Sequence, residues 1–261
     1  MARVVAVANQ KGGVGKTTTS VNLSASLAVE GRSVLLIDLD PQANATSGLG
    51  LITDGSTGTL YDCLARGVAV KDVIQSTSVP KLCAISSCTD LAASEVELVP
   101  VPDRESVLRK VIDRVRGEFD YIIIDCPPAL GLLTINALVA ANTVLVPVQC
   151  EYYAMEGLGR LMSNIARVQS SLNPSLELEG IVLTMFDTRN SLSRQVAEEI
   201  RSHFKDKVYQ SAIPRNVTLA EAPSYGRPVL LYNAASTGCQ AYCELAKEFL
   251  LHGEKSARSG A

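Results

Sequence analysis

Short runs of apolar residues recur along the chain, and they carry almost no polar positions. Residues 3–8, 33–38 and 121–125 form such runs, each of a length typical of a strand. The runs at 143–148 and 180–186 show the same pattern. A strand that is apolar on both faces is typical of a parallel sheet covered by helices on each side. These runs therefore predict the buried strands of a parallel sheet.

Between these runs the apolar residues follow a helical spacing. The segment 191–204 mixes apolar and charged positions as an amphipathic helix does. Asp103 is placed to cap the helix that follows it. The pattern predicts helices at 17–29, 104–116, 131–141, 191–204 and 237–251.

Three other segments complete the pattern. VYQSAIP, at 208–214, predicts one further strand. The region 43–80 is less regular, and its ATSGLG (45–50) and TDGSTGT (53–59) stretches are typical of loops. The polar tail at 253–261 is expected to be disordered.

Strands that alternate with helices predict an α/β fold, with a mostly parallel twisted sheet and helices on both of its faces. A chain of 261 residues without a visible linker fits a single domain, which we place at 1–252. The crossover between the first two strands is expected to be right-handed.

A glycine-rich loop, NQKGGVGKTTT at 9–19, joins the first strand to the first helix. Glycines let backbone N–H groups turn toward phosphate oxygens, and the start of the helix favours negative charge. Lys16 would contact the β- and γ-phosphates, and the Thr17 hydroxyl would bind Mg²⁺. The loop predicts a P-loop domain that binds ATP through Gly12, Gly13, Val14, Gly15, Lys16, Thr17 and Thr18.

Aspartates follow two of the predicted strands at the edge where parallel sheets bind ligands. Asp40 is placed to polarise a water molecule that faces the γ-phosphate, and Asp38 to contact Mg²⁺ through water. Asp125 ends the run YIIID, so we expect it near Mg²⁺ too. The alternative for Asp38 and Asp40 is a purely structural role in a turn or a helix cap.

The glycine loop departs from the strict pattern because Gln10 stands where a glycine is expected and Lys11 is a second lysine. This variant resembles the deviant Walker A loop of the ParA/MinD class of ATPases. The likeness to the ParA/Soj partitioning ATPases covers nearly the whole chain. It extends through DPQANATSGLG (40–50), PVQCEYYAMEGL (147–158), LTMFD (183–187) and IPRNVTLAEAPSYGRPV (213–229).

The resemblance implies roles for several residues. Lys11 would reach the nucleotide of a partner subunit, and Asp40 would be the hydrolytic aspartate. Glu151 would lie near a nucleotide-dependent interface. The residues implied to lie against the adenine are Met185, Pro214 and Asn216. The alternative for Lys11 is that it folds back within its own subunit or is merely solvated.

The resemblance also implies a function. An ATP-bound homodimer would bind DNA without sequence preference, and hydrolysis, stimulated by a centromere-binding ParB-like protein, would release it. The process would be chromosome or plasmid partitioning, with the protein associated with the nucleoid. Two alternatives remain: a MinD-like or polar-positioning ATPase that acts on another surface, and a regulator of replication initiation that uses hydrolysis as a timer.

The charge of the chain limits how it can contact DNA. Its formal net charge is −3, from 24 basic and 27 acidic residues, so any DNA contact needs a local basic patch. The candidate DNA contacts are Arg189, Arg194 and Arg215. An ordinary salt-bridged surface is the alternative. Relatives often have a basic residue where this chain has Thr218.

The remaining composition fits a cytoplasmic protein. Seven scattered cysteines without a secretory signal are typical of reduced thiols, and the spacing of Cys239 and Cys243 does not fit a usual zinc site. No apolar run reaches the ~20 residues that a membrane span needs. The last residues of the chain fit core packing better than membrane anchoring.

Overall fold

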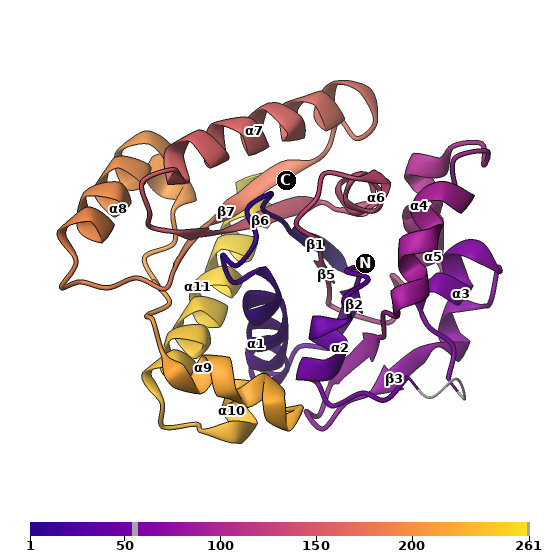
Figure 1. Ribbon diagram of the computed structural model, residues 1–261, viewed down its shortest axis with the longest axis horizontal. Helices are drawn as coiled ribbons and strands as arrows, with labels where there is room; N and C mark the ends of the chain where they lie inside the picture. Colours follow the sequence, from indigo (N-terminus) through magenta and orange to yellow (C-terminus); the bar gives the residue numbers. More distant parts are fainter. Residues whose placement is uncertain (54–56, 260–261) are drawn as a thin grey trace.

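The computed structural model describes residues 1–53 and 57–259, with the side chains of 254–259 left aside. Within these residues, seven strands form one sheet in the order β3-β4-β2-β5-β1-β6-β7 (Figure 1). The strands are β1 (Arg3–Val7), β2 (Val34–Asp38), β3 (Ile74–Ser76), β4 (Leu82–Ile85), β5 (Tyr121–Asp125), β6 (Thr143–Gln149) and β7 (Glu177–Thr184). Every neighbouring pair is parallel except β3 and β4. The predicted α/β fold is confirmed.

Helices cover both faces of the sheet (Figure 1). One face carries α1 (Lys16–Val29), α2 (Asn44–Gly48), α9 (Val217–Glu221), α10 (Val229–Tyr232) and α11 (Thr237–Ser259). The other carries α3 (Leu60–Ala65), α5 (Val107–Asp113), α6 (Leu132–Ala140), α7 (Ala154–Ser171) and α8 (Ser191–Phe204), with the single turn α4 (Ser94–Glu97) beside them.

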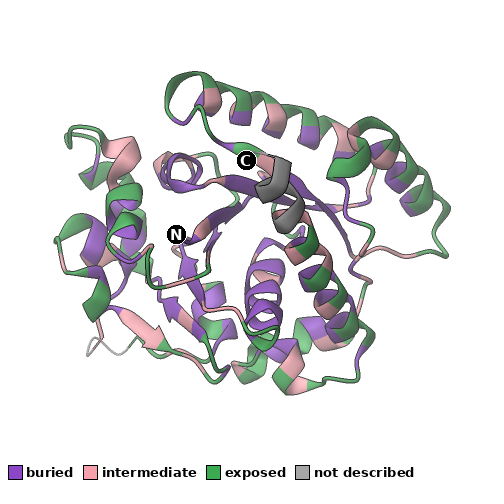
Figure 2. Cartoon of the chain, turned by 180° about the vertical axis from the view of Figure 1, so that it is seen from behind, coloured by how far each residue is buried: buried purple, intermediate pink, exposed green. Residues whose placement is uncertain are grey.

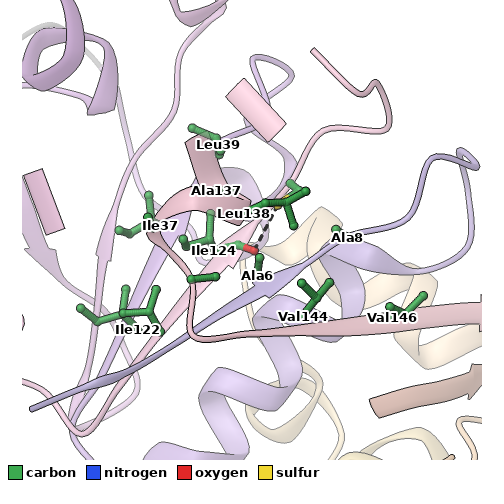
Figure 3. Close-up of a cluster of buried hydrophobic side chains, with 14 of the residues drawn as sticks. Ala6, Ala8, Ile37, Leu39, Ile122, Ile124, Ala137, Leu138, Val144 and Val146 are labelled. Carbon is green, nitrogen blue, oxygen red and sulfur yellow. Dashed lines mark hydrogen bonds between the residues drawn. The ribbon is translucent and has the colours of Figure 1, made fainter. Parts of the chain in front are cut away.

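Alternate residues of each central strand pack into two separate hydrophobic cores. In β1, Val4 and Ala6 face one core, and Val5 and Val7 face the other. Figure 3 shows Ala6 of β1 beside Ile124 of β5 and Val144 of β6 in the first core. β2 is buried throughout, and β1 and β5 are buried at every residue but their first (Figure 2). Both faces are apolar because helices cover both, as the uninterrupted apolar runs predicted.

The strand predicted at 208–214 is wrong. In the described part of the chain, this segment forms isolated bridges in place of a regular strand, from Val208 to Ile181 of β7 and from Pro214 to Phe186 just after β7. Between the bridges, the backbone N–H groups of Gln210 and Ser211 donate to the carboxylate of Glu248 on α11, at 2.7 and 2.9 Å. The helix carboxylate therefore takes the hydrogen bonds that a neighbouring strand would have accepted.

The helix predicted at 104–116 is shorter than expected. It consists of a 3₁₀ turn, η3 (Arg104–Ser106), followed by α5. Asp103 does not cap it through its carboxylate: the residue has φ +53°, and its backbone carbonyl accepts the N–H of Ser106 at 2.8 Å. The left-handed backbone of Asp103 therefore starts a tight turn in place of a regular helix cap.

The segment 45–50, predicted as a loop, lies partly in α2, because Asp38 accepts the backbone N–H of Thr46 and holds this turn. The loop prediction at 53–59 falls partly on 54–56, outside the described residues. Strands β3 and β4 and helix α7 had no counterpart among the predicted elements. Other short 3₁₀ turns are η1 (Val70–Asp72), η2 (Thr89–Ala93), η4 (Lys205–Lys207) and η5 (Ala222–Tyr225).

Helix α11 continues past its predicted end at 251, and its described backbone reaches Ser259. Residues 254–259 contain neither proline nor glycine, the residues that most often end a helix. We expected the tail 253–261 to be disordered. The side chains of 254–259 and all of 260–261 lie outside the described part of the chain, so this expectation stays a prediction.

Candidate functional site

The glycine-rich loop joins the end of β1 to the start of α1, as predicted. Gly13 and Gly15 have φ of +73° and +88°, in the left-handed region that favours glycine. Gly15 is the N-cap of α1 and supplies no side-chain cap, so the first N–H groups of the helix are left for a ligand. The Thr184 hydroxyl, at the end of β7, donates to the Val14 carbonyl at 2.8 Å and holds the loop against the sheet.

A cleft of about 740 Å³ lies in front of this loop. Its walls come from the glycine loop, from the segment after β2, from the end of β7 and from the segment that leads into α9. The residues from the predicted site that line it are Gly12, Gly13, Gly15, Lys16, Thr17, Thr18, Asp40, Met185, Pro214, Arg215 and Asn216. Segments far apart in the sequence therefore meet around one cavity.

Lys16 lies at the inner wall of the cleft. It is 7% exposed, and its ammonium donates to the carbonyl of Lys11 at 3.1 Å. Burial lowers the pKa of Lys16, and the nearby carboxylate of Asp125 opposes this shift. A buried ammonium that is held by only a neutral carbonyl of its own loop is suited to exchange that contact for an anionic phosphate oxygen.

Two buried carboxylates, those of Asp38 and Asp125, end neighbouring strands in register with each other. The carboxylate of Asp38 accepts the N–H of Thr46 at 2.8 Å and its hydroxyl at 2.7 Å. Burial, which these hydrogen bonds oppose, raises the pKa of Asp38 to about 6. Burial, followed by the charge of Asp38, raises the pKa of Asp125 to about 7.

The carboxylate of Asp125 is only half satisfied. Its Oδ1 accepts the hydroxyl of Ser20 at 2.8 Å, whereas Oδ2 is buried and has no hydrogen-bond partner. The Thr17 hydroxyl lies close enough to this carboxyl group to oppose the rise in its pKa. An unsatisfied buried oxygen beside a hydroxyl and a second carboxylate suits a hard divalent cation such as Mg²⁺, which binds oxygen ligands. Thr17, Asp38 and Asp125 thus fit the metal role predicted for them.

Asp40 lies on the wall of the cleft and is 7% exposed. Its Oδ1 accepts the N–H of Gln42 at 3.0 Å, which is the turn role that the sequence left open. Asp40 therefore makes the turn contact and also faces the cleft.

At the far end of the cleft, Met185, Pro214 and Asn216 lie together. The amide of Asn216 caps α9: its Oδ1 accepts the N–H of Leu219 at 3.3 Å, and its Nδ2 donates to Thr237 at 2.9 Å. Met185 has φ +47°, which is uncommon for a residue with a side chain. The amide of Asn216 is thus engaged in capping, and it fixes the backbone at this wall of the cleft.

Lys11 differs from Lys16 in position. Its ammonium forms an ion pair with the carboxylate of Glu151, at the junction between β6 and α7. The two side chains are 43% and 46% exposed. This is the contact within one subunit that the sequence left open as an alternative for Lys11.

The comparisons with known proteins agree with this geometry. Residues 2–178 match the family described as AAA domain. The chain is 52% identical over 253 residues to the sporulation initiation inhibitor protein Soj of Bacillus subtilis, which covers 97% of this chain and 100% of that protein. It is 50% identical over 248 residues to the chromosome partitioning protein ParA of Myxococcus xanthus, across 95% and 88% of the two chains.

The chain belongs to the ParA/Soj family of partitioning ATPases.

A solved structure also resembles this member of the ParA/Soj family. It is named cobyrinic acid a,c-diamide synthase from Mycobacterium smegmatis, with bound ATP analog and magnesium. The TM-score is 0.85 at 37% sequence identity, over 98% of this chain and 97% of that one. In the described part of this family member, no helix is long and apolar enough to cross a membrane.

The candidate DNA contacts do not form one uniform basic patch. Arg189 forms an ion pair with Asp187, and Arg194 donates to the carbonyl of Thr188. Arg215 lines the nucleotide-sized cleft beside Pro214. One of these arginines is therefore brought to the edge of the cleft, and another is already paired with an acid.

Sequence reasoning missed three residues that shape this site in the ParA/Soj family member. Thr184 holds the glycine loop, and Ser20 holds Asp125. Tyr242 lines the cleft from α11, and its hydroxyl lies 3.1 Å from that of Thr19. Ser20 could have been found because it lies one helical turn after Lys16. No local pattern marks Tyr242, which is remote in the sequence.

Proposed function

We propose that this protein is an ATP-dependent switch for chromosome or plasmid partitioning. Mg²⁺ and ATP occupy the cleft, the ATP-bound form is a homodimer that binds nucleoid DNA without sequence preference, and hydrolysis releases it. A ParB-like centromere-binding protein stimulates the hydrolysis. Membership of the ParA/Soj family and the names of the relatives support this role.

The observation that carries the proposal is the division of the glycine loop between two environments. Lys16 is buried inside the cleft, whereas Lys11 lies at the surface and is held by an exposed glutamate. An exposed ion pair contributes only about 0–1 kcal/mol, so a stronger anion can displace it. The γ-phosphate of a nucleotide in a facing subunit is such an anion.

In this proposal, the glycine loop, the aspartates and Thr17 have separate tasks in hydrolysis. The N–H groups of the glycine loop and Lys16 hold the β- and γ-phosphates and withdraw charge from them. Thr17, Asp38 and Asp125 hold Mg²⁺, which when bound neutralises charge on the transferring phosphate. Asp40 orients and polarises the attacking water molecule through the oxygen that is not engaged with Gln42.

Dimerisation and hydrolysis are coupled through Lys11 in this proposal. A lysine supplied by the partner subunit adds positive charge where the transition state is most negative. The ATP-bound state then favours the dimer, and loss of the γ-phosphate removes the anion that holds Lys11 across the interface. Release of Lys11 allows its ion pair with Glu151 to form again.

DNA binding in this proposal uses Arg189, Arg194 and Arg215. All three lie on segments that follow β7, and Arg215 lines the cleft. Phosphate contacts by arginine carry no sequence information, which fits a protein that binds the nucleoid in general.

The test is to measure the size of the protein by light scattering without nucleotide, with ADP and with ATP, each with and without a random-sequence DNA duplex. We expect a monomer in the first two states, and a dimer that binds DNA with Mg²⁺ and ATP. Equal size and equal DNA binding in all three states would contradict the proposal. Binding to liposomes in place of DNA would favour the MinD-like alternative.

A test in cells separates the remaining alternative. Depletion of a partitioning protein changes the segregation of the chromosome or plasmid before it changes the number of replication origins per cell. The opposite order of events would favour a regulator of replication initiation.

A further inference from the structure

The loop between β7 and α8 contains an acid that faces the candidate DNA contacts. Asp187 is fixed there by its own backbone surroundings: its Oδ1 accepts the N–H of Arg189 at 3.0 Å, and its carbonyl accepts the N–H of Asn190 at 3.1 Å. Asn190 in turn caps α8 with its side chain. This is a turn built around an aspartate, so the position of the carboxylate is set by the fold.

The same carboxylate holds the guanidinium of Arg189 with two parallel hydrogen bonds. Nε donates to Oδ1 and an Nη donates to Oδ2, both at 3.0 Å. The hydrogen bonds from Arg189 and the charge of Arg215 lower the pKa of Asp187 to about 2, so it is ionised at neutral pH. The side chain of Arg189 is 89% exposed and that of Asp187 is 32% exposed.

Asp187 occupies the Nε side of the Arg189 guanidinium, so a DNA phosphate that binds this side must displace the carboxylate, and one that binds the remaining Nη donors meets its negative charge. Carboxylate and phosphate present their oxygens to a guanidinium in the same forked geometry. The charge of Arg215 also lowers the pKa of Asp187, so the two groups interact electrostatically. The carboxylate of Asp187 therefore repels a phosphate that approaches Arg215. Two of the three candidate arginines are therefore opposed by one acid.

We propose that Asp187 is a built-in competitor of the DNA phosphate and sets how tightly the ATP-bound dimer holds DNA. The inference rests on the proposed function. Asp187 weakens the contacts of Arg189 and Arg215 with DNA phosphates by a modest factor. The DNA contacts of the dimer together are then weak enough for hydrolysis to reverse binding. Arg189 is exchanged between the carboxylate and the phosphate, and the exchange leaves the fold of the loop unchanged.

The substitution Asp187→Asn tests this directly. Asparagine keeps the oxygen that accepts the N–H of Arg189, so the turn is preserved while the charge is lost. In the presence of ATP and Mg²⁺, we expect Asp187→Asn to tighten binding to a random-sequence duplex by about two- to fivefold, the range of an exposed ion pair. We also expect the slope of log affinity against log salt to become steeper by about 1, because one more phosphate is neutralised.

The matched control is Asp206→Asn. Asp206 is exposed in η4, next to Lys205 and Lys207, and it forms no ion pair in the described part of the chain. Its substitution removes the same charge from the opposite end of α8. Only the Asp187 variant should lose its gain in affinity when Arg189→Gln is added to it. Equal gains for both aspartates, or a gain that persists in full without Arg189, would overturn the inference.

A second variant, Asp187→Ser, guards against a folding defect. A serine hydroxyl also accepts a hydrogen bond in such a turn, although more weakly. Thermal unfolding of each variant shows whether the fold is kept, and tighter DNA binding by either folded variant supports the inference. If the wild-type protein binds no DNA in any nucleotide state, the proposed function fails. If it binds DNA and neither folded variant binds more tightly, the inference about Asp187 alone fails.

Discussion

Two lysines of one short loop lie in opposite environments. Lys16 is at the floor of the cleft, which we define as Lys16, Thr17, Asp38 and Asp125, and it is 7% exposed. Lys11 is at the rim, which we define as Lys11 and Glu151, where both side chains are about half exposed. Buried charges are held by the surrounding structure, whereas an exposed pair is easily exchanged. The floor is thus suited to a permanent task and the rim to a conditional one.

The difference extends to the groups around each lysine. The floor carries two carboxylates with raised pKa and one buried oxygen without a partner, so it is destabilised unless a cation is present. At the rim, Lys11 and Glu151 form an ion pair with each other within one subunit. The floor therefore requires a ligand, whereas the rim can function with or without one. Substitutions in each region should separate these two properties.

The largest effect is expected from the floor substitution Lys16→Ala. Its ammonium is the only lysine ammonium among the described residues that line the cleft, so its loss removes the main positive charge from the phosphate site. We expect ATP affinity to fall by at least ~100-fold, the value of roughly two charge-assisted hydrogen bonds. Titration calorimetry with ATP and Mg²⁺ measures this. Micromolar affinity in the variant would contradict the assignment of this loop to phosphate binding.

Asp40→Ala should affect turnover more than binding. The carboxylate is expected to polarise the attacking water molecule, and loss of such a group typically lowers the rate by about 10²–10⁴-fold. We expect ATP binding and the ATP-dependent dimer to persist while phosphate release stops. A phosphate-release assay, with calorimetry as the control for binding, tests this. Hydrolysis at the wild-type rate would leave only the turn contact with Gln42 as the role of Asp40.

A smaller effect on nucleotide affinity is expected from the rim substitution Lys11→Ala. The variant should bind ATP within about tenfold of the wild type and fail to dimerise, because the lost charge acts in a neighbouring subunit. Analytical ultracentrifugation with ATP measures the dimer. Glu151→Gln is the comparison, since it removes the other half of the same ion pair.

The two rim variants distinguish two roles of Lys11. If the lysine serves only its ion pair with Glu151, both substitutions should have the same effect on the size of the protein. If it acts in the partner subunit, Lys11→Ala alone should remove the ATP-dependent dimer through loss of that lysine. An unchanged dimer in Lys11→Ala would rule out the role in the partner subunit.

Local patterns made much of this site predictable. The glycine loop and the aspartates at the ends of β2 and β5 are encoded in contiguous sequence, because a loop and the strand end beside it form one unit of structure. The continuous apolar runs likewise predicted the parallel sheet. The end of the cleft near Met185 and Asn216 was predicted through resemblance to a family, and the residues themselves carry no local signal of it.

Other features depend on contacts between distant segments. The failed strand at 208–214 has the apolar ends of a strand, but Glu248 on α11 accepts two of its N–H groups. The position of Tyr242 beside Thr19 also depends on how α11 is placed. A carboxylate on a remote helix is invisible to local periodicity, so such features require the fold.

The smallest effect is expected from Asp125→Asn, and this substitution should make the nucleotide-free protein more stable. The pKa of Asp125 is raised from 3.8 to about 7, so between these values the folded protein binds a proton that the unfolded chain does not. Without nucleotide, this group therefore makes the wild-type protein less stable as pH rises from about 4 to about 7, and the loss is complete above that pH. Asparagine carries no charge to bury, and its oxygen can still accept the hydroxyl of Ser20.

The nucleotide-free variant should thus be more stable than the wild type at pH 8 by ~1–3 kcal/mol, the cost of an unsatisfied buried group, and the difference should shrink at pH 5. Urea unfolding at both pH values measures it, with Asp40→Asn as the control at the cleft wall. Mg²⁺ and ATP should stabilise the wild type more than the variant, because the variant lacks the anionic oxygen that the cation needs. If the variant is less stable than the wild type at pH 8, or if Mg²⁺ and ATP stabilise both proteins equally, buried charge does not destabilise the floor. The contrast between a floor that requires a cation and a rim that does not would then be lost.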